Sequence, residues 1–200
     1  VRVTHAFGVD GTPAAVLLDA EGRIASPITF GARFILALAG GFSADDAPAD
    51  GSERIGRPAP NLELKGVDGE AIRLADFRGR PTLVVQWDTN CGYCARMLRE
   101  LKAHDVSQPA GTPQLLVVAR GDRAMVRSMD MRSAVAFDDD FRGMRAFRAY
   151  ATPSAVLVDA DGKIASPIAV GAAQVMGLAR AATPDAIDDA IRAIEDPDEA

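Results

Sequence analysis

The feature that most constrains the fold of this chain is a pair of cysteines, Cys91 and Cys94, where a buried strand should pass into a helix. The run at 83–87 (LVVQW) is apolar and contains β-branched and aromatic residues, which predicts a core strand. Beyond the second cysteine, apolar and charged residues occupy opposite faces at helical spacing, which predicts an amphipathic helix. Cys91 is therefore expected at or just before the N-terminus of that helix.

A helix N-terminus stabilises an anion, because its first backbone N–H groups are unpaired and the helix dipole is positive there. We therefore expect a lowered pKa for Cys91, so that its thiolate is a usable nucleophile. Cys94 lies one turn further along, close enough to attack a mixed disulfide at Cys91 and release the partner. The two cysteines thus predict thiol-disulfide exchange.

The composition limits the kinds of partner. Two hundred residues, 48% of them hydrophobic, suffice for one well-packed domain with an extension. A net charge of -6 disfavours nucleic acid as a partner, because nucleic acid selects a concentrated basic surface. No apolar run reaches the roughly 18 to 20 residues that span a bilayer, so we expect no stable membrane insertion.

Other uses of the cysteine pair fit the sequence less well. A disulfide scaffold would use several pairs, and the short loop between these two cysteines would add little entropic stabilisation. A structural zinc site needs four ligands, and His5 and His104 show no ligand spacing to the pair. We expect no metal and no organic cofactor.

An ungapped internal repeat connects the two ends of the chain. Residues 12–28 (TPAAVLLDAEGRIASPI) recur as residues 152–168 (TPSAVLVDADGKIASPI). Each copy predicts a Thr-Pro turn, an apolar strand, a reversal at an acidic residue and a glycine, a second strand and an apolar helix. The cysteine motif that precedes the second copy has no counterpart before the first. Residues 1–40 are therefore predicted to be a partial repeat.

A hairpin and one helix cannot bury both of their faces and are marginal in water. Three possibilities remain for residues 1–40: docking on the complete domain, pairing with another chain, which would allow self-association, or forming the tail of a preceding domain. Residues 41–54 are rich in Ala, Asp, Gly and Pro and predict a linker. Residues 55–196 predict a complete domain.

Strands and helices alternate in the complete domain. A hairpin is predicted around Asp68-Gly69 from the alternating residues 61–64 and 71–74. The patterns also predict buried strands at 115–118 and 134–137, helices at 124–129 and 141–147, and a last helix that starts at Pro184 and buries Ile187, Ile191 and Ile194. This order predicts an α/β fold with a mixed central sheet flanked by helices.

Five segments carry a family resemblance: RPAP at 57–60, LADFRGR at 74–80, the strand ending in Trp87, CGYC at 91–94, and TPS at 152–154 with LVDADG at 157–162. Together they resemble the thioredoxin superfamily, and within it the TlpA- and MauD-like thiol-disulfide oxidoreductases, also called redoxins. The resemblance covers about residues 55–182 and implies a thioredoxin-like fold. Residues 1–40 resemble the C-terminal half of the same fold.

The resemblance also implies roles for individual residues. Pro153 would be a cis-proline facing the dithiol, and Thr152 would present its backbone to an incoming peptide as an added strand. Trp87 would pack beneath the site, and Tyr93 would lie at the substrate-binding surface. The partners would be disulfide-containing or dithiol proteins. Pro13 matches Pro153 by repeat but has no dithiol, so we expect only a rigid turn there.

The chain departs from the better-known thioredoxins near the cysteines. Val85 stands where those proteins have a buried acid that helps to deprotonate the second cysteine. Asp88, Glu100 or an ordered water are candidates for that step, although a capping or solvated role is the simpler expectation for both acids. Asn90 and Tyr93 replace a Trp and a Pro.

Two alternative functions remain open. A thiol peroxidase needs Thr or Ser three residues before its reactive cysteine, and Asp88 occupies that position. A thioredoxin-like module that only binds would have no need of the two cysteines. The cellular location is also open: cytoplasmic for a chain without a signal peptide, or outside the bacterial cytoplasmic membrane, as the resemblance implies, if the N-terminus is truncated.

The remaining polar and sulfur-containing residues are expected to be structural. His104 is predicted near a helix C-terminus, as a charge–dipole contact or a surface residue, and Asp138–Asp140 in an exposed loop. Arg142, Arg145 and Arg148 predict a solvated helix face. Core filling is the expected role of the methionines Met125, Met129, Met131 and Met144.

Overall fold

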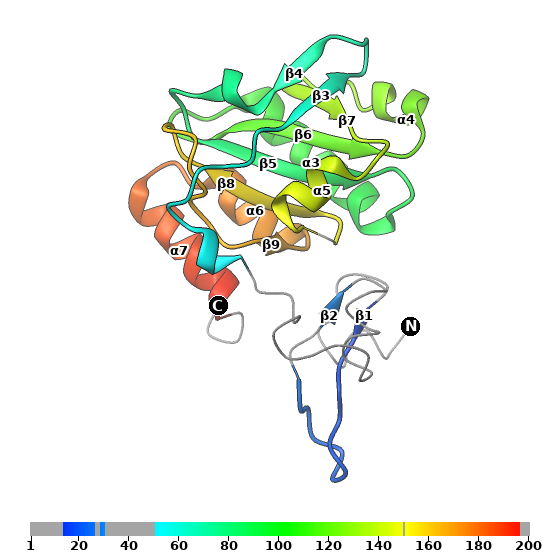
Figure 1. Cartoon of the computed structure of the whole chain (residues 1–200), viewed down its shortest axis with the longest axis vertical. Coiled ribbons are helices and arrows are strands. Elements are labelled where there is room, and N and C mark those ends of the chain that lie inside the picture. The colour runs from blue at the N-terminus through cyan, green and yellow to red at the C-terminus, as the bar shows by residue number, and fades with distance from the viewer. Residues whose placement is uncertain (1–13, 27–28, 31–50, 150, 197–200) are drawn as a thin grey trace. The chain divides into compact units, whose positions relative to one another are not determined.

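The structure is a computed structural model, and it describes residues 14–26, 29–30, 51–149 and 151–196. The chain divides into two compact units, residues 1–49 and residues 50–200 (Figure 1). The helix expected at the end of the first repeat, the turn at Pro13 and residues 41–50 of the expected linker lie outside the described residues.

The second unit is built on a mixed sheet of seven strands. They are β3 (Glu63–Gly66), β4 (Ala71–Arg73), β5 (Thr82–Asp88), β6 (Gln114–Arg120), β7 (Ala134–Phe137), β8 (Ser154–Val158) and β9 (Ala169–Val170), in the order β4-β3-β7-β6-β5-β8-β9. β5, β6 and β7 are parallel, and the other neighbours are antiparallel. The predicted α/β fold with a mixed sheet is confirmed.

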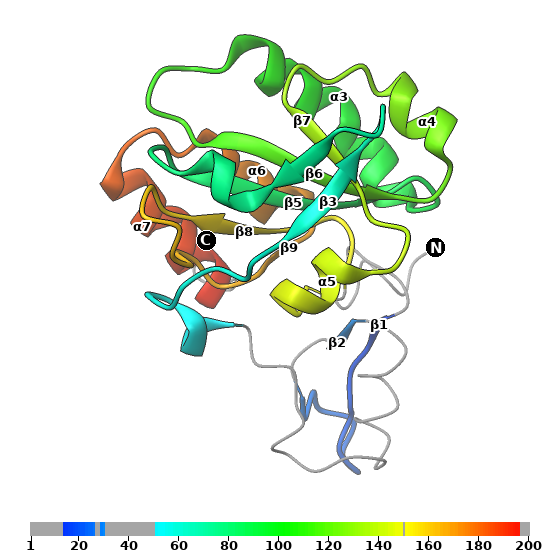
Figure 2. The same ribbon diagram turned by 45° about the horizontal axis from the view of Figure 1, so that its top comes forward.

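Helices cover both faces of this sheet (Figures 1 and 2). They are α3 (Gly92–Ser107), α4 (Arg123–Ser128), α5 (Arg142–Phe147), α6 (Ala172–Arg180) and α7 (Pro184–Glu195), with short 3-10 helices η3 (Ser52–Arg54) and η4 (Leu74–Phe77). The predicted boundaries are close to these. Leu74 belongs to η4 rather than to a strand, and the α7 isoleucines are half-buried against the core rather than fully buried.

All seven residues of β5 are buried, because β6 and β8 cover its edges and helices cover both faces. Its side chains alternate between two apolar clusters, as the pleat of a strand requires. Leu83, Val85 and Trp87 pack with residues of α3 and α6, whereas Val84 packs with Phe147 of α5 and with β8. The end of β5 is therefore fixed on four sides, and the cysteines follow directly from it.

α5 lies close against the sheet. Gly143 has no room for a side chain, because a Cβ there would lie 2.8 Å from Cγ1 of Val118. Asp138, predicted in an exposed loop, is only 2% exposed. Its carboxylate accepts hydrogen bonds from the N–H groups of Arg142 (2.7 Å) and Gly143 (2.9 Å), so it caps α5. Arg142, Arg145 and Arg148 are exposed, as predicted.

Two further predictions are wrong because tertiary packing overrides the local pattern. His104 lies in the last turn of α3, near the helix C-terminus as predicted, but it is only 7% exposed, so the prediction of a surface position is wrong. Burial lowers the pKa of His104, the nearby Arg180 lowers it further, and Asp105 opposes both effects. Met125, predicted in the core, is 53% exposed, while Met129 and Met144 are buried and Met131 is half-buried.

The first unit contains the hairpin of the first repeat, in which β1 (Ala14–Ala15) pairs with β2 (Thr29–Phe30). The register Ala15↔Thr29 matches Ala155↔Ala169 in the second copy. Asp19 Oδ1 accepts from the N–H groups of Glu21 and Arg23, as Asp159 Oδ1 does from Asp161 and Lys163. The two reversals thus share the same hydrogen bonds.

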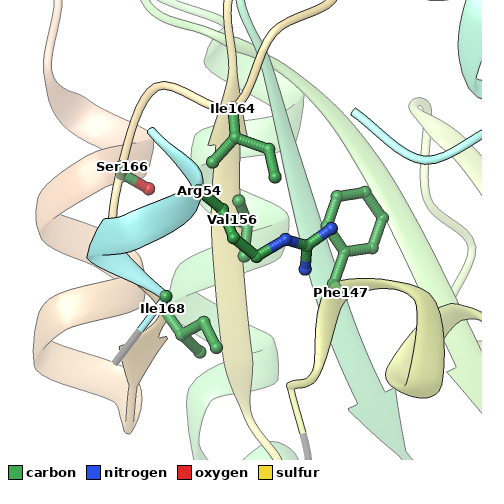
Figure 3. Close-up of a pocket in the computed structure, with 7 residues that line it drawn as sticks. Arg54, Phe147, Val156, Ile164, Ser166 and Ile168 are labelled. Carbon is green, nitrogen blue, oxygen red and sulfur yellow. The ribbon is translucent and has the colours of Figure 1, made fainter. Parts of the chain in front are cut away.

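A small pocket lies on the α5 side of the sheet, where η3 faces β8 (Figure 3). Figure 3 shows the Arg54 side chain reaching past Val156 toward the Phe147 ring. The remaining lining residues are Gly51, Ile164, Ser166 and Ile168. The pocket is on the opposite face of the sheet from α3.

No helix within the described ranges is long and apolar enough to cross a membrane.

Candidate active site

Cys91 is the N-cap residue of α3, as the sequence predicts. Its backbone is extended, and its Sγ accepts a hydrogen bond from the backbone N–H of Cys94 at 3.4 Å. The sulfur therefore lies at the positive end of a helix that runs for 16 residues. Unpaired N–H groups at that position favour a negative charge on the sulfur.

The sulfur of Cys91 also contacts the segment that enters β8. The thiol donates to the carbonyl oxygen of Thr152 at 3.1 Å, and the Thr152-Pro153 peptide bond is cis. Residues far apart in the sequence meet here because β5 and β8 are antiparallel neighbours, with Gln86 opposite Ser154. The structure thus places the cysteine motif beside the Thr-Pro turn of the second repeat.

Cys94 lies in a different environment, although it is only one turn away. It is 1% exposed and belongs to the apolar cluster beneath α3, while Cys91 is half-exposed. Burial raises the pKa of the Cys94 thiol strongly, and contacts with the Asp88 backbone and Thr152 offset only part of this effect. Both cysteines are free thiols here. Cys94 is therefore protonated at neutral pH and sheltered from solvent.

The other two predicted site residues lie on either side of the dithiol. Trp87 is 3% exposed and packs in the same apolar cluster as Cys94. Tyr93 is half-buried in the first turn of α3, and the guanidinium of Arg96 lies 4.3 Å from the centre of its ring. Trp87 is therefore part of the buried core next to Cys94, while the Tyr93 ring is partly exposed.

The loop that carries Cys91 is fixed by Asp88, the last residue of β5. Asp88 Oδ1 accepts from the N–H of Asn90 at 2.8 Å, and its backbone carbonyl accepts from the N–H of Cys91 at 3.1 Å. Its other carboxylate oxygen pairs with Arg120 at 2.7 Å. Asp88 is therefore buried, and it fixes the loop between β5 and α3. Glu100, the second candidate acid, is exposed and pairs with Arg180 on α6.

Arg120 was not apparent from the sequence as part of the site. It ends β6, and the parallel register places it directly beside Asp88. The alternation of strands and helices predicts that the two strands are parallel but does not fix their register.

Within the described ranges, no group of three or more His, Cys, Asp or Glu side chains converges as metal ligands would.

Comparisons with known proteins agree with this geometry. The family model described as AhpC/TSA matches residues 55–166, which include both cysteines and the Thr-Pro turn. The chain is 24% identical over 124 residues to the thiol-disulfide oxidoreductase ResA of Bacillus thuringiensis subsp. konkukian (strain 97-27), a match that covers 57% of this chain and 69% of that protein. The corresponding protein of Bacillus cereus (strain ATCC 10987 / NRS 248) is 25% identical, with the same coverage.

A similar solved structure is that of a putative thiol:disulfide interchange protein DsbE from Chlorobium tepidum. The TM-score is 0.52 at 22% identity, and the match covers 68% of this chain and 97% of that one. This likeness shows the fold, a thioredoxin-like arrangement of a mixed sheet with flanking helices.

The different burial of the two sulfurs predicts their reactivity. When the reduced protein is treated with iodoacetamide near neutral pH, Cys91 is alkylated first, and Cys94 only after denaturation, because the latter is a buried thiol. Peptide mass mapping measures the two sites separately. The Cys94→Ser variant should retain the wild-type rate, and Cys91→Ser should be nearly unreactive. Alkylation of native Cys94 at a rate comparable with Cys91 would contradict the assignment.

Proposed function

This chain belongs to the AhpC/TSA family, and from this premise we propose that it exchanges disulfides with protein partners through Cys91 and Cys94. It is a thiol-disulfide oxidoreductase, in keeping with the relatives whose names carry that activity. The observation that carries the proposal is the position of the Cys91 sulfur, which is held between the N-terminus of α3 and the carbonyl of Thr152. A sulfur that packs only as a core residue needs neither contact.

The reaction uses both sulfurs in turn. The Cys91 thiolate attacks one sulfur of a partner disulfide, and the other partner sulfur leaves as a thiolate. Cys94 then loses its proton and attacks Cys91 Sγ, which breaks the mixed disulfide and releases the second partner sulfur. The partner gains two electrons, and the chain is left with a Cys91–Cys94 disulfide. A dithiol partner runs the same steps in reverse.

The surrounding residues have supporting roles in this proposal. Thr152 offers its backbone to an extended peptide, which pairs with it as an added strand beside Pro153. Once Cys91 has lost its proton, its sulfur no longer donates to the Thr152 carbonyl. Trp87 supports the buried Cys94, and the Tyr93 ring, with Arg96 stacked on it, contacts the partner. The partners are proteins with a disulfide or a dithiol.

The alternatives are less well supported. Peroxide cleavage would need a hydroxyl three residues before Cys91, whereas Asp88 stands there with its carboxylate engaged by Asn90 and Arg120. A module that only binds would not need the difference in burial between the two thiols. We therefore favour disulfide exchange with protein partners.

A direct test measures the reduction of a protein disulfide by the reduced chain and compares wild type, Cys91→Ser and Cys94→Ser. We expect Cys91→Ser to lose activity almost entirely, because no other thiolate is available at the helix N-terminus. Hydrogen peroxide consumption, measured on the same samples, should be negligible. Equal disulfide reduction by wild type and Cys91→Ser would exclude the proposal, and rapid peroxide consumption that depends on Cys91 would favour a peroxidase.

We also propose that residues 1–40 are a partial thioredoxin-like repeat, joined through 41–54 to the thioredoxin-like domain of residues 55–196. The shared register and the shared hydrogen bonds of the two reversals support this. One difference matters: Leu17, Leu18 and Ile24 are 43%, 49% and 63% exposed, whereas their counterparts Leu157, Val158 and Ile164 are 1%, 3% and 3% exposed. The first hairpin thus leaves uncovered the apolar residues that its copy buries.

Exposed apolar residues at these positions favour pairing with a second copy of the chain. We expect the intact chain to show a concentration-dependent increase of mass in analytical ultracentrifugation. Leu18→Asp combined with Ile24→Asp should abolish the increase, because charged side chains resist burial. The matched exposed residue Met125→Asp in the second unit should leave it unchanged. A chain that stays monomeric at every concentration would argue against self-association through this hairpin.

A further inference from the structure

Asp88 fixes the loop before Cys91 through its side chain and its backbone. The side chain accepts from the N–H of Asn90, and the backbone carbonyl accepts from the N–H of Cys91. The residue is only 8% exposed, and its second carboxylate oxygen lies 2.7 Å from Nε of Arg120. A buried carboxylate with one cationic partner is therefore attached to the same short loop as the reactive sulfur.

Arg120 is held in place from several sides. Its backbone carbonyl accepts from the N–H of Thr89, in the same loop, at 3.1 Å. Its guanidinium carbon lies 4.1 Å from the centre of the Phe141 ring, and its side chain is 27% exposed. Next to it, a Cβ at Gly121 would lie 2.0 Å from Oγ1 of Thr89, so the two chain segments are in close contact. The guanidinium thus contacts both the Asp88 carboxylate and the Phe141 ring.

The other charged groups around the loop have partners of their own. Arg96 of α3 stacks on Tyr93, Asp122 caps α4, Arg123 pairs with Asp139, and Asp138 caps α5. On α3, the Cys94 thiol lies one turn from Cys91, and burial keeps it protonated. Among the described residues, Asp88 and Arg120 are thus the opposite charges bonded to the loop itself.

We propose that Asp88 and Arg120 are positioning residues that set the reactivity of Cys91 by holding two opposite, mutually compensating charges on the loop that carries its sulfur. The proposal deepens the function proposed above and rests on it. A single unit charge in a partly buried place acts on its neighbours more strongly than one in water. While the pair is intact, the groups that contact the sulfur are the Cys94 N–H at the helix N-terminus and the Thr152 carbonyl. Loss of either charge leaves the other one uncompensated on the loop that carries Cys91.

The two single substitutions therefore have opposite effects. Asp88→Asn keeps the acceptor for Asn90 but leaves the Arg120 cation unpaired, which favours the Cys91 thiolate. Arg120→Gln leaves the Asp88 carboxylate unpaired, which disfavours the thiolate. If the substitutions acted only by loosening the loop, the pH midpoint of Cys91 alkylation would shift in the same direction in both variants. Opposite signs therefore separate an electrostatic role from a structural one.

The experiment follows the rate of Cys91 alkylation against pH in the full-length reduced chain. We expect the midpoint to fall by about one pH unit in Asp88→Asn and to rise by about as much in Arg120→Gln. Each shift corresponds to roughly a tenfold change in rate below the midpoint. The double variant should return close to wild type. The exposed pair Arg123→Gln with Asp139→Asn serves as the matched control and should leave the midpoint unchanged.

Shifts in the same direction in both single variants, or no shift in either, would overturn the proposal. Circular dichroism of each variant checks that the chain is folded. If one single variant fails to fold, the direction of the midpoint shift in the other still tests the proposal. The alkylation midpoints and the disulfide-reduction assay are separate measurements, so failure of this proposal can be told from failure of the proposed function. Opposite shifts in a chain that reduces no protein disulfide would reject disulfide exchange and leave the role of the pair intact.

Discussion

The site depends on the buried strand β5, because the place where it ends determines the hydrogen bonds of one sulfur. Cys91 Sγ accepts from the N–H of Cys94 and donates to the carbonyl of Thr152, so it joins the start of α3 to the start of β8. This junction exists because β5 is buried between β6 and β8, which fixes where α3 begins and where the Thr-Pro turn lies. The chemistry of the chain follows from this position.

The two cysteines are chemically alike but differ in environment. Cys91 lies at the helix end, partly open to solvent, while Cys94 faces the apolar cluster around Trp87. Burial suppresses ionisation of the Cys94 thiol, whereas the Cys91 sulfur lies at the N-terminus of α3 and is partly open to solvent. The order of events, attack by Cys91 and resolution by Cys94, is thereby built into the fold. The first step requires no acid at the position of Val85.

The sequence predicts the parts of the fold that are determined by local periodicity. Strand 83–87, the helix that follows it, the hairpin at Asp68-Gly69 and the order of strands and helices were all predicted, because apolar spacing and turn residues specify them. The meeting of Cys91 with Thr152 was inferred from family resemblance. Burial of Asp88 and Asp138 was missed, since the partners that make burial tolerable lie on other elements: Arg120 on β6 and the first N–H groups of α5. His104 and Met125 were misjudged for the same reason, because exposure depends on tertiary neighbours.

The central claim is that Cys91 makes the first bond with the partner and Cys94 breaks it. The most direct measurement is mass spectrometry of the Cys94→Ser chain after incubation with a disulfide-bonded peptide. A peptide adduct confined to Cys91 should accumulate in this variant, while the wild-type chain should proceed to an internal disulfide and keep no adduct. An adduct elsewhere, or none in Cys94→Ser while wild type still reduces the peptide, would contradict the account.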